Sequence, residues 1–175
     1  MREVLFKAKL QDWKTNPQHN KWVEGYYLSR KETTYCFTED YEKFPVKTLH
    51  YIAVDSMTDW GLPNEFRCYE IDPDTLCQYT NKNDIDGNKV WENDIVKYWN
   101  YHDGDNYAQI KFGTYQSCFD KRESKHHGFY VDWKDNMRKD LGYWFEWSDN
   151  TNIVGNIFDN PEILKGEEVD ETLRS

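Results

Sequence analysis

The chain has 175 residues, enough for one large domain or two small ones, and its 8 Trp, 13 Tyr and 9 Phe exclude a disordered protein because aromatic side chains need a folded setting. The formal net charge is −10, from 32 acidic and 22 basic residues, which disfavours binding to duplex nucleic acid because its phosphates need a basic face. No apolar run approaches the roughly 18 residues of a membrane helix, and residues 1–7 lack the apolar core of a secretion signal. We therefore expect a cytoplasmic protein that does not associate with membranes.

Strand signals dominate the first half of the chain. Four segments have the apolar pattern of strands: residues 4–10, 22–28, 49–54 and 66–71. Pro17 and its polar neighbours predict a turn, Gly25 marks a bulge or close packing, and Pro73 after Asp72 favours one helical turn. Between residues 29 and 45 the pattern is weak.

The second half continues in the same way. Five further strands are predicted, at residues 95–99, 108–113, 128–133, 143–147 and 153–158. Asp86-Gly87 predicts a tight turn, Glu92-Asn93-Asp94 a second turn, and residues 116–127 a loop. Residues 160–164 predict a last helical turn, and the charged residues 166–175 a flexible tail. Short strands with frequent turns predict a mainly β fold, either a small barrel or a sandwich.

Four blocks of sequence, in this order and spacing, resemble the YopX family of phage and prophage proteins: residues 1–9, 22–26, 71–96 and 153–164. The longest block contains the residues that we expect to form a structural motif, namely Gln78, Tyr79, Thr80, Gly87, Trp91, Glu92, Asn93 and Asp94. Residues 100–149 carry little of the pattern. The resemblance implies small antiparallel SH3-like barrel units and an origin in a phage or prophage of a bacterial host cell. It implies no catalytic mechanism.

Two asparagines replace glycines of the family pattern. Asn81 and Asn93 stand where the family has Gly, and Lys82 stands where it has Leu. Asn is the residue other than Gly that best tolerates a left-handed backbone. We therefore predict positive φ angles at both asparagines, as structural pivots that bind no ligand.

No sequence pattern marks an enzyme. The chain has no phosphate-binding loop, H-E-x-x-H or nucleophile elbow, so we expect neither catalytic residues nor a cofactor. Asp84, Asp86 and Gly87 are spaced as in part of a calcium loop, but an EF-hand frame would place Lys82 at the first ligand position. A plain turn is the better interpretation.

The histidines and cysteines do not predict a metal site either. His126 and His127 are adjacent, and on an extended chain they point to opposite sides. The four cysteines are far apart and lack the paired spacing of zinc ligands, so we expect buried or half-buried thiols.

Two tryptophans are the candidate binding residues. Trp99 and Trp144 fall in aromatic runs where exposure would give a stacking surface for bases or sugars, although core packing is the commoner role. We expect one YopX-like domain over residues 1–165, with two β lobes at about 1–71 and 78–165 as an open alternative.

Two functions stay open. The first is a non-enzymatic binding or regulatory module that acts on a host or phage protein. The alternative is a nucleic-acid-associated accessory protein that uses aromatic stacking. The sequence leaves homo-oligomerisation open and does not identify the partner.

Overall fold

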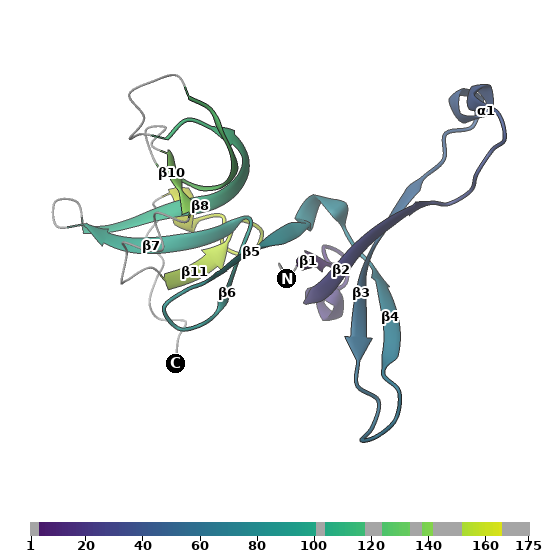
Figure 1. Ribbon diagram of the computed structural model, residues 1–175, viewed down its shortest axis with the longest axis horizontal. Helices are drawn as coiled ribbons and strands as arrows, with labels where there is room; N and C mark the ends of the chain where they lie inside the picture. The colour runs from purple at the N-terminus through teal and green to yellow at the C-terminus, as the bar shows by residue number, and fades with distance from the viewer. Residues whose placement is uncertain (1–3, 101–103, 118–123, 134–137, 142–151, 166–175) are drawn as a thin grey trace. The chain divides into compact units, whose positions relative to one another are not determined.

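The computed structural model describes residues 4–100, 104–117, 124–133, 138–141 and 152–165, and these form mainly antiparallel β-strands (Figure 1). The chain divides into two compact units, residues 1–78 (unit 1) and residues 79–175 (unit 2). β5 (Cys77–Asn83) crosses the boundary, since Cys77 and Gln78 pair with β1 (Phe6–Lys9) while Tyr79 and Asn83 pair with β6 (Lys89–Trp91). Each unit has its own buried core.

Unit 1 contains a sheet in the order β4-β3-β2-β1, and every neighbouring pair is antiparallel. Its remaining elements in chain order are η1 (Pro17–His19), β2 (Trp22–Lys31), α1 (Thr38–Lys43), β3 (Thr48–Ser56), β4 (Glu65–Glu70) and η2 (Pro73–Thr75). Ala8, Ile52 and Ile71 form the buried core. Gly25 is confirmed as a site of close packing, because a Cβ there would lie 2.2 Å from the Ala53 carbonyl oxygen.

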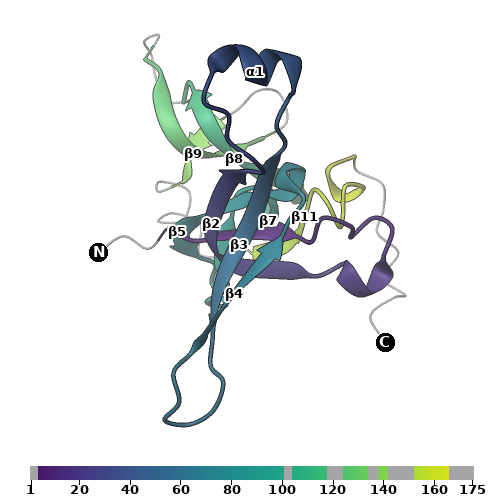
Figure 2. The same cartoon turned by 90° about the vertical axis from the view of Figure 1, so that its right-hand side faces the viewer.

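β2, β3 and β4 form an antiparallel meander whose two connections lie at its opposite ends (Figure 2). One end carries α1, which the weak sequence pattern does not predict. The Tyr41 hydroxyl accepts a hydrogen bond from the Tyr35 N–H at 3.0 Å, and the two rings lie 5.2 Å apart. The other end is the connection between β3 and β4, residues 57–64.

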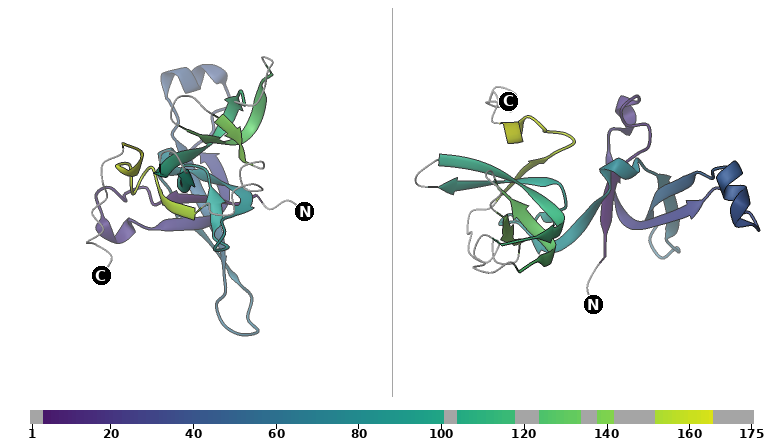
Figure 3. Two further views of the ribbon diagram at one scale, coloured as in Figure 1. Left: turned by 90° about the vertical axis from the view of Figure 1, so that its left-hand side faces the viewer. Right: turned by 90° about the horizontal axis from the view of Figure 1, so that it is seen from above.

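Unit 2 contains a five-stranded antiparallel sheet in the order β10-β9-β8-β7-β11 (Figure 3). Its elements after β6 are β7 (Asp94–Asn100), β8 (Gly104–Tyr115), β9 (His126–Asp132), β10 (Arg138–Asp140), β11 (Asn152–Asn156) and η4 (Ile163–Lys165). The core combines residues of β6 to β9 with two that follow β9 and β10: Val90, Val96, Ala108, Ile110, Val131, Trp133 and Leu141. Ala108 and Ile110, alternate residues of β8, therefore face this core together with Val96 of β7.

The mainly β prediction is confirmed, as are the helical turns after Asp72 and near the C-terminus. The strand order of each sheet is open, and no closed barrel forms among the residues that the structure describes. The predicted strand at 143–147 and the tail at 166–175 lie outside these residues. No helix within the described ranges combines the length and the apolar character needed to cross a bilayer.

Two predictions are wrong. His126 and His127 belong to β9 and not to a loop, because they pair with Tyr115 and Thr114 at the end of the long strand β8. Cys36 and Cys68 are exposed, whereas Cys77 is buried. Cys68 lies in the stretch of β4 whose residues 65–68 are all exposed, and Cys36 lies just before α1, which has no buried residue.

Candidate functional site

The residues of the structural motif are used inside the fold, beginning with the β5–β6 hairpin. The Thr80 hydroxyl donates to the Val90 carbonyl at 2.8 Å and accepts from the Lys82 N–H at 3.3 Å. Tyr79 pairs with Trp91 across the two strands, and their ring centroids lie 5.4 Å apart. These contacts join the two strands and leave the Thr80 hydroxyl occupied.

The acidic run between β5 and β6 forms the plain turn that the sequence predicts. The carboxylate of Asp84 is buried and accepts hydrogen bonds from the backbone N–H groups of Asp86 at 3.1 Å and of Asn88 at 2.7 Å. The Asn88 side chain adds a third bond at 3.1 Å. Gly87 has φ +84°, which a glycine adopts without strain. Asp84 therefore organises the turn.

Asn93 is the pivot of the turn between β6 and β7. Its φ is 67° and that of Asn81 is 61°, so the predicted left-handed backbone is confirmed at both positions. The Asn93 N–H donates to the Ile110 carbonyl at 2.8 Å, its carbonyl accepts from the Ile157 N–H at 3.1 Å, and its side-chain oxygen accepts from the Gln109 amide at 2.9 Å. The residue thus ties the turn to β8 and to the segment after β11.

The other motif residues also have structural positions. Asp94 is almost fully buried, and its carboxylate accepts from the Trp91 N–H at 2.8 Å, which closes the turn around half-buried Glu92. Gln78 pairs with Phe6 of β1.

Of the two candidate tryptophans, the structure describes only the backbone of Trp99. Trp99 lies in β7, where its backbone pairs with Asp105 of β8. Its side chain and the whole of Trp144 lie outside what the structure describes. Their proposed stacking role stays a prediction.

Instead, the connection between β3 and β4 presents three exposed large apolar side chains within six residues, among them Trp60 and Met57, the two most exposed among those described in unit 1. Trp60 is 89% exposed, Met57 72% and Leu62 60%. We call these three residues the apolar tip. Large apolar groups gathered in water mark contact sites for other molecules, and Trp is enriched among residues that dominate protein–protein binding. Sequence reasoning missed them because residues 57–64 follow no strand or helix period.

The apolar tip is carried by an ordered turn. The Thr58 hydroxyl donates to the Pro63 carbonyl at 2.9 Å, and the Leu62 N–H donates to the Asp59 carbonyl at 3.2 Å. Gly61 has φ +76°, so the chain reverses at a residue that accepts this backbone. Hydrogen bonds within the turn hold the apolar side chains outward.

The surroundings of the apolar tip are acidic. Residues 55–67 contain Asp55, Asp59 and Glu65 but one cation, Arg67. The Arg67 guanidinium already pairs with Glu65 at 2.6 Å. The Asp55 carboxylate accepts a hydrogen bond from the Asn64 side chain at 3.2 Å. Because Asn64 is neutral, this bond does not neutralise the charge of Asp55. The tip is therefore an apolar group with a negative border.

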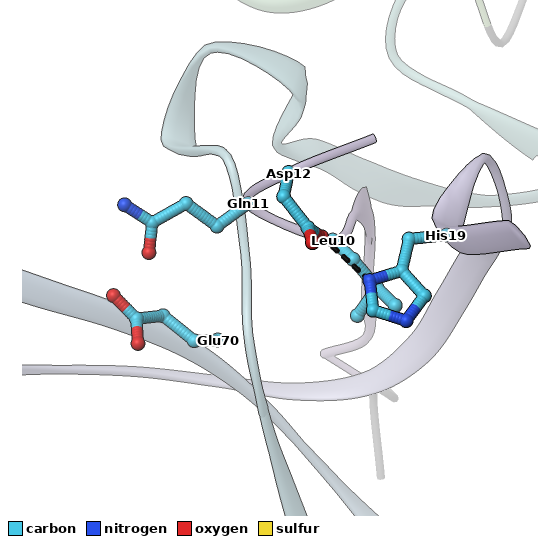
Figure 4. Close-up of a pocket in the computed structure, with 5 residues that line it drawn as sticks. All are labelled: Leu10, Gln11, Asp12, His19 and Glu70. Atoms are coloured by element: carbon cyan, nitrogen blue, oxygen red, sulfur yellow. Dashed lines mark hydrogen bonds and ion pairs between the residues drawn. The ribbon is translucent and has the colours of Figure 1, made fainter. Parts of the chain in front are cut away.

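A shallow pocket in unit 1 is lined by Leu10, Gln11, Asp12, His19 and Glu70 (Figure 4). The hydrogen bond between His19 Nδ1 and Asp12 Oδ1, 2.7 Å long, lowers the pKa of the Asp12 carboxyl from its ordinary value. Both side chains are about half exposed. Throughout the described ranges, no three His, Cys, Asp or Glu residues are grouped as metal ligands. The pair is a surface contact to which we assign no chemistry.

The chain is similar to a known family over most of its length. A family model described as YopX protein matches residues 13–165, a range that contains three of the four resemblance blocks and leaves out residues 1–9. No curated protein matches the chain. The crystal structure of protein EF1440 from Enterococcus faecalis is similar to it with a TM-score of 0.43 and 18% identity, over 94% of this chain and 99% of that one. Because the family match covers most of the sequence, the protein belongs to the YopX family.

Proposed function

We propose that the protein is a phage- or prophage-derived, non-enzymatic binding module that acts on a host or phage protein through the apolar tip. The single observation that carries this is the exposure of Trp60, Met57 and Leu62 on a hydrogen-bonded turn. Covering a side chain of this size gains about 1.5–3 kcal/mol, so leaving three in water has a cost that a partner would remove. Membership of the YopX family supports the phage or prophage origin.

The chemistry of the tip defines its partner. Trp60 and Leu62 need an apolar pocket, and the carboxylates of Asp55 and Asp59 beside them favour Lys or Arg at the rim of that pocket. A protein surface with a small apolar pocket and a basic border fits both features.

The alternative, a nucleic-acid-associated protein, draws on the exposure of Trp60, which offers a face for base stacking. The charges of residues 55–67 oppose it, because Arg67 is the only cation there and is paired with Glu65.

We also propose an SH3-like barrel for unit 2. Its order β10-β9-β8-β7-β11, a meander whose last strand returns beside the first, supports that architecture.

A photo-cross-linking amino acid at position 60 tests the contact in the host cell that carries the phage or prophage. The matched control has the same amino acid at position 37, because Phe37 is also exposed, at 68%, but lies beside α1 at the other end of the meander. We expect a discrete adduct with another protein from position 60 only. Purified adduct partner should then bind the wild-type chain and lose binding to Trp60→Ser.

Three results would overturn the proposal. They are the absence of any adduct at position 60, equal adducts at both positions, and adducts with nucleic acid in place of protein. The last would favour the alternative.

A further inference from the structure

β4 is an edge strand of unit 1 that is open along its first four residues. Residues 65–68 are exposed, and no strand among the residues described pairs with β4 on the side away from β3. The edge is closed further along, where the Gln11 N–H donates to the Glu70 carbonyl at 3.2 Å. Open backbone groups at a sheet edge are a template for a further strand.

The ladder with β3 determines which backbone groups of β4 face outward. The Ile71 N–H donates to the His50 carbonyl at 3.0 Å, and the register with β3 is unbroken back to Glu65. Inward and outward residues alternate along an antiparallel strand. Residues 65, 67 and 69 therefore bond to β3, whereas Phe66 and Cys68 direct their N–H and C=O groups outward. The outward carbonyl of Glu70 follows the same alternation.

Two copies of the open stretch, residues 65–68, have complementary charges when they run antiparallel. Glu65 and Arg67 flank Phe66, so an antiparallel pair that places Phe66 opposite Phe66 also places each Glu65 opposite an Arg67. The two Phe66 residues then exchange both backbone hydrogen bonds, as their outward orientation requires. The Glu65–Arg67 pairs occupy the closer, non-hydrogen-bonded positions, about 4.5 Å between Cα atoms, where opposite charges stabilise a sheet.

We propose that two copies of this chain associate through β4, antiparallel and centred on Phe66. The charges of Glu65 and Arg67 favour this register over those centred on an adjacent residue. A shift of the axis to Arg67 would oppose two arginines, and a shift to Glu65 would oppose two glutamates. An axis on Cys68 would require the edge beside Glu70, which Gln11 already covers. The contact also covers Phe66, which is 64% exposed in the single chain.

Sedimentation of the full chain under reducing conditions tests the dimer with four proteins: wild type, Glu65→Arg, Arg67→Glu and the double variant. We expect wild type to dimerise below about 1 mM. Each single variant places like charges opposite each other at both 65–67 pairs between the chains. It should therefore associate at least roughly tenfold more weakly. The double variant should recover wild-type association.

An equimolar mixture of the two single variants separates the proposed contact from the Glu65–Arg67 ion pair within one chain. Mixing cannot restore an ion pair within a chain, but it restores both pairs between chains, so we expect a heterodimer. Cys68→Pro adds a test of the backbone, because it removes an outward N–H beside the Phe66 pair and should weaken the dimer while the melting temperature stays near wild type.

Wild type that stays monomeric at about 1 mM, single variants that associate as wild type does, or a mixture that forms no heterodimer would each overturn the proposal. The dimer contact is made by residues 65–68 and uses none of the three residues of the apolar tip, so a monomeric protein would leave the proposed partner contact standing.

Discussion

The turn at Asn93 and the apolar tip are opposites in how they use their side chains. At the turn, the backbone and side-chain groups of Asn93 bond to Ile110, Ile157 and Gln109. At the tip, Trp60 and Leu62 project into water from a turn whose hydrogen bonds are all local. The polar groups of the first region are satisfied by its own fold, whereas the second leaves its apolar side chains in water.

The residues that identify the family differ from those that we propose contact a partner. The side chains of Thr80 and Asp94 bond to backbone groups of unit 2, and that of Asn93 accepts from the Gln109 side-chain amide. The tip carries none of the quoted pattern. A motif that identifies a family can therefore mark the requirements of folding, and the contact surface that we propose contains none of its residues.

Of the two regions compared, the turn has the larger expected effect. Asn93→Val places a β-branched residue at φ 67° and should lower the free energy of unfolding by roughly 1–3 kcal/mol. Asn93→Gly is the control, since it removes the strain but also the bond from Gln109, and it should be nearly neutral. Urea unfolding of both variants measures the difference. Equal tolerance of Val and Gly would show that the turn does not constrain the backbone.

A somewhat smaller effect is expected in the β5–β6 hairpin. Thr80→Val keeps the shape but removes the hydroxyl that bonds to the Val90 carbonyl and the Lys82 N–H, so stability should fall by about 1–2 kcal/mol. Thr80→Ser keeps the hydroxyl and should retain most of that stability. Thermal unfolding decides between them, and a valine variant as stable as the serine variant would remove this residue from the structural motif.

The apolar tip should contribute little to folding. Trp60→Ser and Leu62→Ser should each change the free energy of unfolding by no more than about 0.5 kcal/mol, because both side chains are mostly in solvent. Ile110→Ala in the core of unit 2 is the comparison, with an expected loss of roughly 2–5 kcal/mol. A tip variant that destabilises as strongly as the core variant would mean that the tip packs against its own chain.

The smallest effect is expected at the exposed pair of Asp12 and His19. Because the hydrogen bond from His19 lowers the Asp12 pKa below its ordinary value of 3.8, the pair stabilises the folded state above that value and loses its effect as pH falls through the lowered pKa. Asp12→Asn should therefore differ from wild type slightly at neutral pH and converge with it near about pH 2. A difference in stability between the two proteins that grows as the pH falls would contradict this expectation.

The sequence predicted the strands and turns well where local chemistry decides them. The positive φ angles at Asn81 and Asn93 followed from the replacement of glycine, and the strand after Asn93 from its apolar pattern. The helix α1 and the start of β9 at His126 were missed, because the contacts that accompany them follow no strand or helix period: Tyr35 with Tyr41, and Tyr115 with His126.

The candidate site was less predictable than the fold. Exposure of Trp60 depends on how far the β3–β4 connection extends beyond the sheet, which no local pattern records. The aromatic runs around Trp99 and Trp144 favoured those residues, whereas Trp60 of the apolar tip stands alone between Asp59 and Gly61.

The most direct test measures partner binding and folding together in two variants. Purified partner, identified by cross-linking at position 60, is titrated with Trp60→Ser/Leu62→Ser and with Asn93→Val, each below its melting temperature. We predict that the tip variant loses binding at an unchanged melting temperature, while the turn variant melts earlier and binds as wild type does. Retained binding by the folded tip variant would contradict the assignment of the apolar tip as the contact surface.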